Sequence, residues 1–280
     1  MIADLLYGSQ VFLSGLPIVW MIGSITFVYA LMRKNNGYAD VVYPIHFMAL
    51  GTAAWIFTFL YTIIIGATMS IATLVLLMTY LWGMRLSLRI ARKNRGKPED
   101  FRYATWRREW KWFRVRSYFQ IYLLQGVIAS IIALPVTLTI IEANFMRITF
   151  NSLESTWIVV FIMTWVTGFF FESIGDRQLD RFLKREDRPR IMTEGLWKYT
   201  RHPNYFGEAL MWWSLAGIAC IVVPDLWYII ILSPILITFL LTKVSGIPML
   251  EAKWAGDPEW EEYRARTNAL IPWFPKKRQS

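Results

Sequence analysis

The chain has 280 residues, of which 55% are hydrophobic and only 18% are charged. Soluble proteins carry about 25% charged residues, and the apolar residues here form long continuous runs, so we predict an all-α polytopic membrane protein. A β-barrel would instead alternate apolar and polar residues. The net charge of +10 does not indicate nucleic-acid binding, because the Lys and Arg residues cluster in particular loops. The one cysteine, Cys220, excludes an internal disulfide and a cysteine-rich metal site.

Seven apolar runs approach or exceed the roughly 20 residues that cross a bilayer as a helix. We predict spans at residues 11–32, 39–65, 70–90, 118–141, from about 156 to beyond 176, 205–223 and 226–244. A Gly-Ala-Thr turn at Gly66 separates the second and third spans, and a short loop at 142–154 precedes the fifth. The first run lacks the basic region and the cleavage site of a signal peptide.

Two polar segments flank the spans. Residues 92–116 interleave Lys and Arg with Phe, Tyr and Trp, which predicts an amphipathic segment in the headgroup layer. The tail, residues 246–280, predicts a short helix and an interfacial Ile-Pro-Trp-Phe anchor at 271–274.

Charge predicts the orientation. The loops after spans one, three and five and the tail are basic, whereas those after spans two, four and six carry almost no Lys or Arg. The positive-inside rule then places the N-terminus outside and the C-terminus in the cytoplasm. Without an internal repeat or a soluble second domain, residues 1–280 are predicted to form one transmembrane domain, in a bacterial inner membrane or a eukaryotic endomembrane.

The densest polar block lies between spans five and six, at residues 171–208. Glu172, Asp176 and Asp180 recur every four residues and so share a helical face. Such a face is either solvated or part of a site, and ionisable groups this close to a bilayer favour a site. Six Lys and Arg residues follow between 177 and 190, which can bind phosphate groups or contact anionic lipids. The block is predicted to be cytoplasmic, with the tail free to fold back over it.

The sequence Arg-His-Pro-Asn-Tyr at 201–205 is the most specific part of the block. Pro203 suits the first position of a helix, which places Asn204 in the first turn. Helix N-termini attract anions through unpaired amide groups. The two basic residues before Pro203, and Glu208 one turn after Asn204, would complete an anion or cofactor site.

The motif GLWKYTRHPNYFGE at 195–208 resembles the C-terminal motif of the steroid 5α-reductase-like membrane reductases. It is most similar to their branch named only as a domain of unknown function, DUF1295. The stretches NRGKP at 94–98, FE with DRQL at 171–179, and LIP at 270–272 are also similar to family segments.

The resemblance implies a seven-helix fold that binds NADPH from the cytoplasm and reduces a carbon–carbon double bond conjugated to a carbonyl in a lipid. By motif, Asn204 and Glu208 would hold the nicotinamide end of the cofactor and Asp176 the nucleotide part. Further cofactor candidates are Tyr205, Arg201, His202 and Glu172, the last at a position where steroid reductases use Asn. Residues 245–251, which include Glu251, replace a His- and Arg-bearing segment that contacts the cofactor in the steroid enzymes.

The reaction needs a hydrogen-bond donor or acid at the carbonyl oxygen, where negative charge develops. The family uses a Glu on the second span and a Tyr on the third. The catalytic candidates here are Asp40 and Tyr80, neither in clean alignment, and for Tyr80 the alternative is a hydrogen bond between helices. Arg85, in a segment similar to a DUF1295-type WGxRL motif, would face a phosphate or extend to the interface.

Two other functions remain open. Isoprenylcysteine and phospholipid methyltransferases share an RHPxYxG core and use S-adenosylmethionine, but the Asn after Pro203 and the Glu after Gly207 favour the reductase. A non-enzymatic sterol- or lipid-binding protein could retain the fold without needing NADPH or Glu208. For the reductase, the expected substrate is a steroid-like or other lipid enone. The oligomeric state is not predicted.

Overall fold

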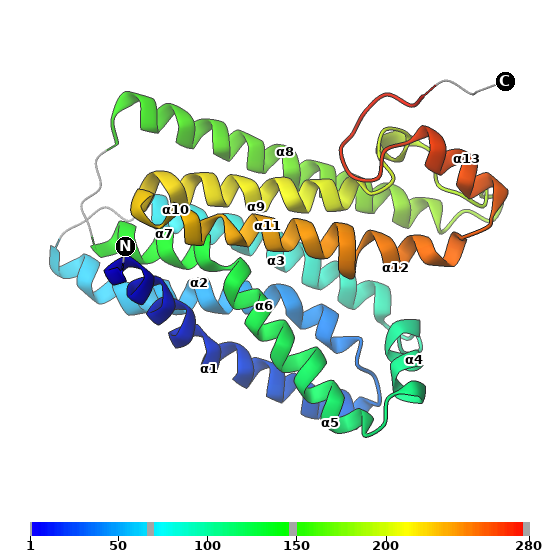
Figure 1. Ribbon diagram of the computed structural model, residues 1–280, viewed down its shortest axis with the longest axis horizontal. Coiled ribbons are helices and arrows are strands. Elements are labelled where there is room, and N and C mark those ends of the chain that lie inside the picture. The colour runs from blue at the N-terminus through cyan, green and yellow to red at the C-terminus, as the bar shows by residue number, and fades with distance from the viewer. Residues whose placement is uncertain (1, 66–69, 146–149, 277–280) are drawn as a thin grey trace. The chain divides into compact units, whose positions relative to one another are not determined.

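The computed structural model describes residues 2–65, 70–145 and 150–276, and within these ranges every regular element is a helix (Figure 1). Seven helical runs in this part of the chain are long and apolar enough to cross a membrane, which confirms the predicted fold class. The runs are Leu6–Arg33, Tyr38–Phe59, Ile71–Asn94, Phe113–Ile132, Ser152–Phe182, Pro203–Val222 and Pro224–Trp254. The turn predicted at Gly66 lies outside the described residues.

The chain divides into two compact units. Unit 1 comprises Met1–Phe150 and Ile218–Ser233, and unit 2 comprises Asn151–Gly217 and Pro234–Ser280. Helices α9 (Pro203–Val222) and α11 (Leu232–Phe239) each contribute residues to both units.

Unit 1 is organised around α2. Its helices are α1 (Ile2–Arg33), α2 (Tyr38–Ile65), α3 (Ser70–Asn94), α4 (Phe101–Glu109), α5 (Phe113–Ser117), the π-helix η1 (Tyr118–Leu123), α6 (Leu124–Ile132), α7 (Leu134–Phe145), the 3₁₀ turn η3 (Pro224–Leu226) and α10 (Trp227–Ile230). α2 packs against α1, α3 and α7. Phe47 of α2 and Trp82 of α3 are both buried, and their rings meet edge-on with centroids 5.3 Å apart. This edge-on packing is a favoured arrangement of aromatic rings in a protein core.

The predicted fourth span is broken between α6 and α7. Pro135 has no backbone N–H, and its ring would clash with the carbonyl four residues earlier in a continuous helix. The N–H of Val136 bonds to the Ala133 carbonyl at 2.9 Å instead of to Ile132. The Ile132 carbonyl accepts a hydrogen bond from the Ser233 hydroxyl at 2.6 Å. The segment predicted as the fourth span therefore contains separate helices, α6 and α7, and a side chain from α11 satisfies the freed carbonyl.

Helix α4 and its preceding turn are fastened to the rest of unit 1 by charged groups. Arg102 Nη2 lies 2.7 Å from Asp40 Oδ2, and the Tyr103 hydroxyl donates to Asp40 Oδ1 at 2.6 Å. Arg107 donates to both carboxylate oxygens of Glu99, at 2.9 Å from Nε and 2.8 Å from Nη2. The predicted amphipathic segment thus contains two short helices, α4 and α5. Hydrogen bonds to Asp40 attach α4 to α2.

Unit 2 begins with α8 (Ser152–Phe182), which is capped at its start. The Asn151 side chain accepts from the Glu154 N–H at 2.9 Å, and the Glu154 side chain accepts from the Asn151 N–H at the same distance. This reciprocal capping box satisfies two N–H groups that the helix leaves free. α8 runs without a break past Asp176 and Asp180, as predicted.

The predicted seventh span, residues 226–244, is followed by a bend. It continues as the π-helix η4 (Leu240–Val244), α12 (Ile247–Glu251) and the 3₁₀ turn η5 (Ala252–Trp254). The N–H groups of Ser245 and Gly246 both bond to the Leu240 carbonyl, at 2.9 and 3.3 Å. A Cβ on Gly246 would overlap the Leu241 carbonyl oxygen, so only glycine fits this bend. The bend sets the direction of α12 and of its last residue, Glu251.

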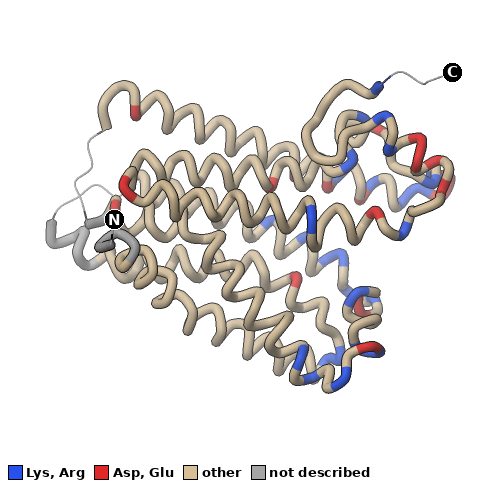
Figure 2. The backbone as a smooth tube through the Cα atoms, in the orientation of Figure 1, with Lys and Arg blue, Asp and Glu red and all other residues tan. Residues whose placement is uncertain are grey.

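Charged residues gather at one end of the helices within each unit (Figure 2). In unit 1 they lie around the end of α3 and on α4 and α5, and in unit 2 around the end of α8 and on α12 and α13 (Pro258–Arg266). These are the segments that were predicted to be basic and cytoplasmic. The membrane orientation itself stays a prediction.

Candidate functional site

The polar block lies in unit 2, where α8 and α9 touch through glycines. A Cβ on Gly168 would lie 2.7 Å from the Gly207 carbonyl oxygen, and one on Gly207 would lie 2.5 Å from the Glu172 nitrogen. A Cβ on Gly175 would lie 3.3 Å from the Asn204 nitrogen. Small residues let the two helix backbones approach closely, as is common between membrane helices. Glu172 is therefore held beside the first turns of α9.

Three carboxylate side chains are buried in this part of unit 2. Glu172 and Asp176 of α8 are each 2% exposed, and Glu208 of α9 is 7% exposed. Asn204, one turn before Glu208, has a buried side-chain oxygen with no hydrogen-bond partner among the described residues. Such an oxygen costs roughly 1–3 kcal/mol when it stays unpaired. It is thus available to a donor from outside the chain.

The turn that precedes α9 is fastened to α8. In the 3₁₀ turn η2 (Gly195–Lys198), the Trp197 indole N–H donates to the Gly175 carbonyl at 3.0 Å. The Leu196 N–H donates to the Gln178 side chain at 2.9 Å. Gly195 has φ +60°, and a Cβ there would lie 2.6 Å from Gln178 Cδ, so both the backbone and the available space require glycine.

Arg201 and His202 are bound by a carboxylate of unit 2. Glu251 Oε1 lies 2.8 Å from Arg201 Nε and 2.9 Å from His202 Nε2, and Glu251 Oε2 lies 3.2 Å from Arg201 Nη2. Arg201 Nη1 also donates to the backbone carbonyls of Arg264 and Thr267. Most donors of the guanidinium are therefore used within the chain. The geometry supports an anchoring role for both residues, and their predicted cofactor contacts stay predictions.

The surroundings of His202 favour the neutral form of its ring. Burial lowers the pKa of His202, and its hydrogen bond with Glu251 offsets only part of this shift. Because the partner is a carboxylate, Nε2 carries the proton and donates it. The ring stacks on Tyr205 with centroids 5.3 Å apart and planes 10° from parallel, and Trp197 lies edge-on at 6.4 Å. Tyr205, another cofactor candidate, is thus packed against the His202 ring, and its predicted cofactor contact stays a prediction.

The tail folds back on the segment before α9, as expected. Backbone and side-chain hydrogen bonds join Tyr199 to Trp273, Thr200 to Ala269 and Leu270, and Arg201 to Asn268. The Tyr263 hydroxyl of α13 donates to the Trp197 carbonyl. Ile271, Trp273 and Phe274 point outward, at 65–75% exposure, and their predicted role as a membrane anchor is compatible with this exposure.

The candidates from the second and third spans belong to unit 1. Asp40 forms the ion pair with Arg102 described above, and the Tyr80 hydroxyl forms a 2.7 Å hydrogen bond with the Thr52 hydroxyl. This is the contact between helices that was the alternative for Tyr80. Arg85 is half-buried on α3. Their catalytic or phosphate-binding roles stay predictions.

Glu251 is the residue that sequence reasoning missed. It was noted only as part of a segment that departs from the steroid reductases. A carboxylate at the polar end of the last apolar run, in a chain that buries an Arg-His pair elsewhere, is a signal for an ion pair. The sequence alone did not identify which carboxylate supplies it, because the bend at Gly246 brings Glu251 into place.

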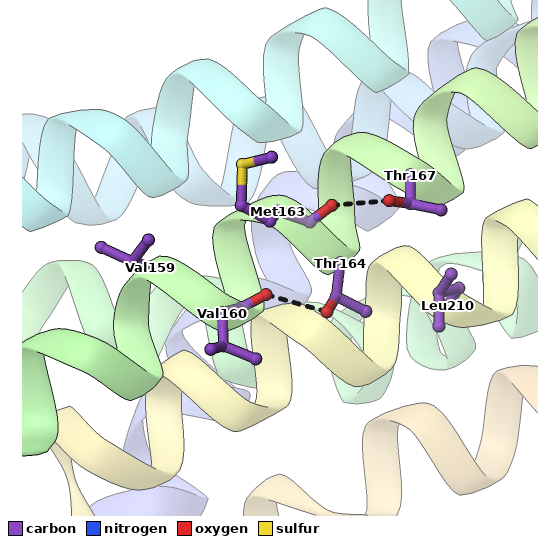
Figure 3. A pocket seen from close by; sticks show the side chains of 6 residues that line it. All are labelled: Val159, Val160, Met163, Thr164, Thr167 and Leu210. Carbon is purple, nitrogen blue, oxygen red and sulfur yellow. Dashed lines mark hydrogen bonds between the residues drawn. The ribbon is translucent and has the colours of Figure 1, made fainter.

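A shallow apolar groove with a volume of about 340 Å³ lies on α8 in unit 2 (Figure 3). Its lining consists of Val159, Val160, Met163, Thr164, Thr167 and Leu210. The hydroxyls of Thr164 and Thr167 donate to carbonyls one turn earlier, at 2.8 Å each. The groove thus presents mainly carbon atoms and carries none of the polar candidates.

Comparison with known proteins identifies one family whose model matches most of the chain. The model of the family described as "Protein of unknown function (DUF1295)" matches residues 26–267. The chain is 25% identical over 243 residues to "Uncharacterized protein C594.04c" of Schizosaccharomyces pombe, in an alignment that covers 76% of this chain. It spans 65% of the length of that relative. No solved structure matches the chain.

Proposed function

This chain belongs to the DUF1295 family, and we propose that it is an NADPH-dependent membrane reductase of a lipid carbon–carbon double bond conjugated to a carbonyl. The support from the sequence is the motif at 195–208, which resembles that of the steroid 5α-reductase-like reductases. The observation that supports it most is the burial of Glu208 and of the Asn204 side-chain oxygen on one turn of α9, beside Glu172 and Asp176 of α8.

The side chains in this part of unit 2 fit the polar end of a nicotinamide. The buried oxygen of Asn204 lacks a partner among the described residues and can accept from a carboxamide N–H. Glu208 offers a second acceptor one turn further along α9. Glu172 and Asp176 can accept from hydroxyl groups, such as those of ribose. This set of acceptors suits an amide and sugar better than it suits phosphate.

The reaction class divides the work between the cofactor and the chain. NADPH, when bound, supplies the hydride that adds to the β-carbon of the enone. The chain's own task is to orient the nicotinamide through Asn204 and Glu208 and to polarise the substrate carbonyl with a donor. Tyr80 of unit 1 stays the candidate donor that the family resemblance suggests. Arg201 and His202 act on the site indirectly, by fixing the start of α9.

The experiment is a titration of the detergent-purified chain with NADPH, followed by cofactor fluorescence. Glu208→Gln should weaken binding about tenfold or more, since hydrogen bonds with charged groups contribute about 1.5–3 kcal/mol, and Asn204→Ala about two- to tenfold, since neutral hydrogen bonds contribute about 0.5–1.5 kcal/mol. Glu261→Gln, an exposed carboxylate on α13, is the matched control and should bind like the unmodified chain. Unchanged affinity in both site variants would show that the site is misplaced.

The same titration separates the alternatives. Binding of S-adenosylmethionine with no response to NADPH would favour the methyltransferase reading of the RHPxYxG core. Binding of neither, with retention of a lipid, would favour a non-enzymatic lipid-binding protein. Incubation with NADPH and a lipid extract should yield a product that is heavier by two hydrogens, which mass spectrometry detects and which would identify the substrate.

A further inference from the structure

The α4–α5 segment of unit 1 contains cations that bind other polar side chains and cations that do not. Arg102 and Arg107 bind carboxylates, and Arg116 donates to Gln120 at 3.0 Å. Lys111 and Arg114 are exposed, and neither forms an ion pair or a hydrogen bond with another side chain in the part of the chain that the structure describes. Lys111 Nζ lies 5.9 Å from the centroid of the Trp112 ring. The two positive charges lie three residues apart, at the start of the candidate span Phe113–Ile132, and are available to an anion from outside the chain.

Trp112, between them, is turned outward by its backbone. Its φ is +56° and its ψ is +44°, a left-handed conformation that a bulky residue rarely adopts. The neighbouring aromatic rings are covered: Trp110 stacks on Trp106 at 5.0 Å, and Phe113 is buried. Trp112 is 76% exposed. The left-handed turn therefore leaves one indole ring facing away from unit 1.

An apolar stripe continues from this ring. Val115 and Phe119 lie four residues apart in the helical run that follows Trp112, and each is 57% exposed. Both belong to the candidate span Phe113–Ile132, so the stripe enters the hydrocarbon layer if that run crosses the membrane. Trp112 stands at its polar end, where indole rings favour the membrane interface.

We propose that Lys111 and Arg114 bind the phosphate of an anionic phospholipid whose acyl chain lies along Trp112, Val115 and Phe119. The two cations and the stripe match the two parts of such a lipid, a negative headgroup and an apolar chain. Arg presents a planar fork that binds phosphate oxygens bidentately, and Lys adds a compact positive charge. A zwitterionic lipid brings a cationic group into the same place and fits less well.

The test measures lipid retention by the full chain. Detergent-purified protein is titrated with dioleoylphosphatidylglycerol or dioleoylphosphatidylcholine, and bound lipids are counted by native mass spectrometry. The unmodified chain should retain the anionic lipid more tightly. Each basic group near an anionic surface contributes roughly fivefold in affinity, so Lys111→Gln with Arg114→Gln should weaken this retention about 30-fold.

A matched control removes the same charges elsewhere on the basic end of unit 1. Arg33→Gln with Lys34→Gln deletes one Arg and one Lys at the end of α1, both of them exposed. Retention should stay within about twofold of the unmodified chain. An equal loss in the two double variants would mean attraction to net charge alone and would overturn the proposal, as would undiminished retention in the Lys111 and Arg114 variant.

Trp112→Gly tests the apolar part without disturbing the turn. Glycine adopts a positive φ freely, so the backbone keeps its shape while the indole ring is lost. We expect weaker retention of the anionic lipid with an unchanged melting temperature. Full retention in this variant would show that Trp112 does not bind the acyl chain of the lipid. It would also overturn the proposed acyl-chain site along Trp112, Val115 and Phe119.

Discussion

Glu251 holds Arg201 through both of its carboxylate oxygens, at 2.8 Å from Nε and 3.2 Å from Nη2. The guanidinium side chain is 9% exposed and the carboxylate side chain 15% exposed. The same carboxylate holds His202. The last helix of the seventh run thereby fixes the two residues that introduce α9, within unit 2.

Removing Glu251 should destabilise the protein strongly. Truncating one partner of a buried ion pair leaves an uncompensated charge, at a cost of about 3–5 kcal/mol. Glu251→Ala should therefore lower the melting temperature of the detergent-solubilised chain, measured by intrinsic fluorescence. Protease cleavage within residues 267–276 should also increase, because Arg201 helps to hold this segment.

A surface ion pair provides the matched control for Glu251. Glu261 and Arg264 of α13 lie 3.3 Å apart with both side chains about half exposed. Exposed pairs contribute at most about 1 kcal/mol, so Glu261→Ala should leave the melting temperature almost unchanged. A similar small effect for Glu251→Ala would mean that the buried pair contributes little to stability.

Acidification should weaken the fold through His202. The pKa of His202 is lowered in the folded state mainly by burial, whereas in the unfolded chain it is near its ordinary value of 6.5. Below pH 6.5 the unfolded chain therefore binds more protons, and the free energy of unfolding falls as the pH drops. The groups facing the ring are Glu251, Arg201, Trp197 and Tyr205. Thermal melts between pH 7.5 and 5 should show this fall.

The comparison variant for the pH effect is His202→Gln, which cannot titrate. Its melting temperature should be lower at pH 7.5 but less dependent on pH between 7.5 and 5. Burial would raise the pKa of Glu99 and of Asp100, but hydrogen bonds from Arg107 and Arg102 outweigh it and hold both below their ordinary values of 4.5 and 3.8. Those groups respond only at lower pH. An equal slope in the variant would assign the effect to other groups.

Gly207→Ala should disrupt the contact between α8 and α9. The added methyl group would overlap the Gly168 carbonyl oxygen and crowd Glu172, and backbone atoms cannot rotate away. Gly51→Ala is the control, because its methyl group would lie 3.0 Å from the flexible end of Leu76. We expect a clearly lower melting temperature and weaker NADPH binding for Gly207→Ala, and a small change for Gly51→Ala, where the better helix propensity of Ala offsets some crowding.

Two substitutions in unit 1 separate structural from catalytic roles. Tyr80→Phe removes the hydrogen bond with Thr52, which should cost only about 0.5–1.5 kcal/mol of stability. If Tyr80 donates to the substrate carbonyl, kcat should fall by about 10²–10³ at the same time. Asp40→Asn weakens the ion pair with Arg102. It should lower the melting temperature and leave kcat close to that of the unmodified chain. Unchanged kcat in Tyr80→Phe would remove this residue from the reaction.

Apolar run length was enough to predict the helices but not their interruptions. α8 begins and ends close to the prediction because one continuous pattern carries it from Ser152 through Asp180. The break before Pro135 was missed because proline is tolerated in membrane helices when another group satisfies the freed carbonyl, here the Ser233 hydroxyl. That partner is about 100 residues away in sequence, so no local pattern indicates it.

The candidate site was predicted unevenly for the same reason. Asn204, Glu208 and the start of α9 at Pro203 follow from local helix chemistry, and the structure has α9 begin at Pro203. The contact between Gly207 and Glu172 depends on how two helices cross, which the sequence does not state. The partner of Arg201 depends on the bend at Gly246, and a glycine alone does not reveal the direction of a bend.

The hydrogen bonds between residues 199–201 and 268–273 set an order of assembly. During synthesis α8 and α9 leave the ribosome well before their partners in the tail exist. The helices can enter the membrane early, but Arg201 and His202 gain their anchors only when α12, α13 and the residues after them have been made. A nascent chain that stalls before Glu251 would thus contain α8 and α9. It would still lack the carboxylate that binds Arg201 and His202.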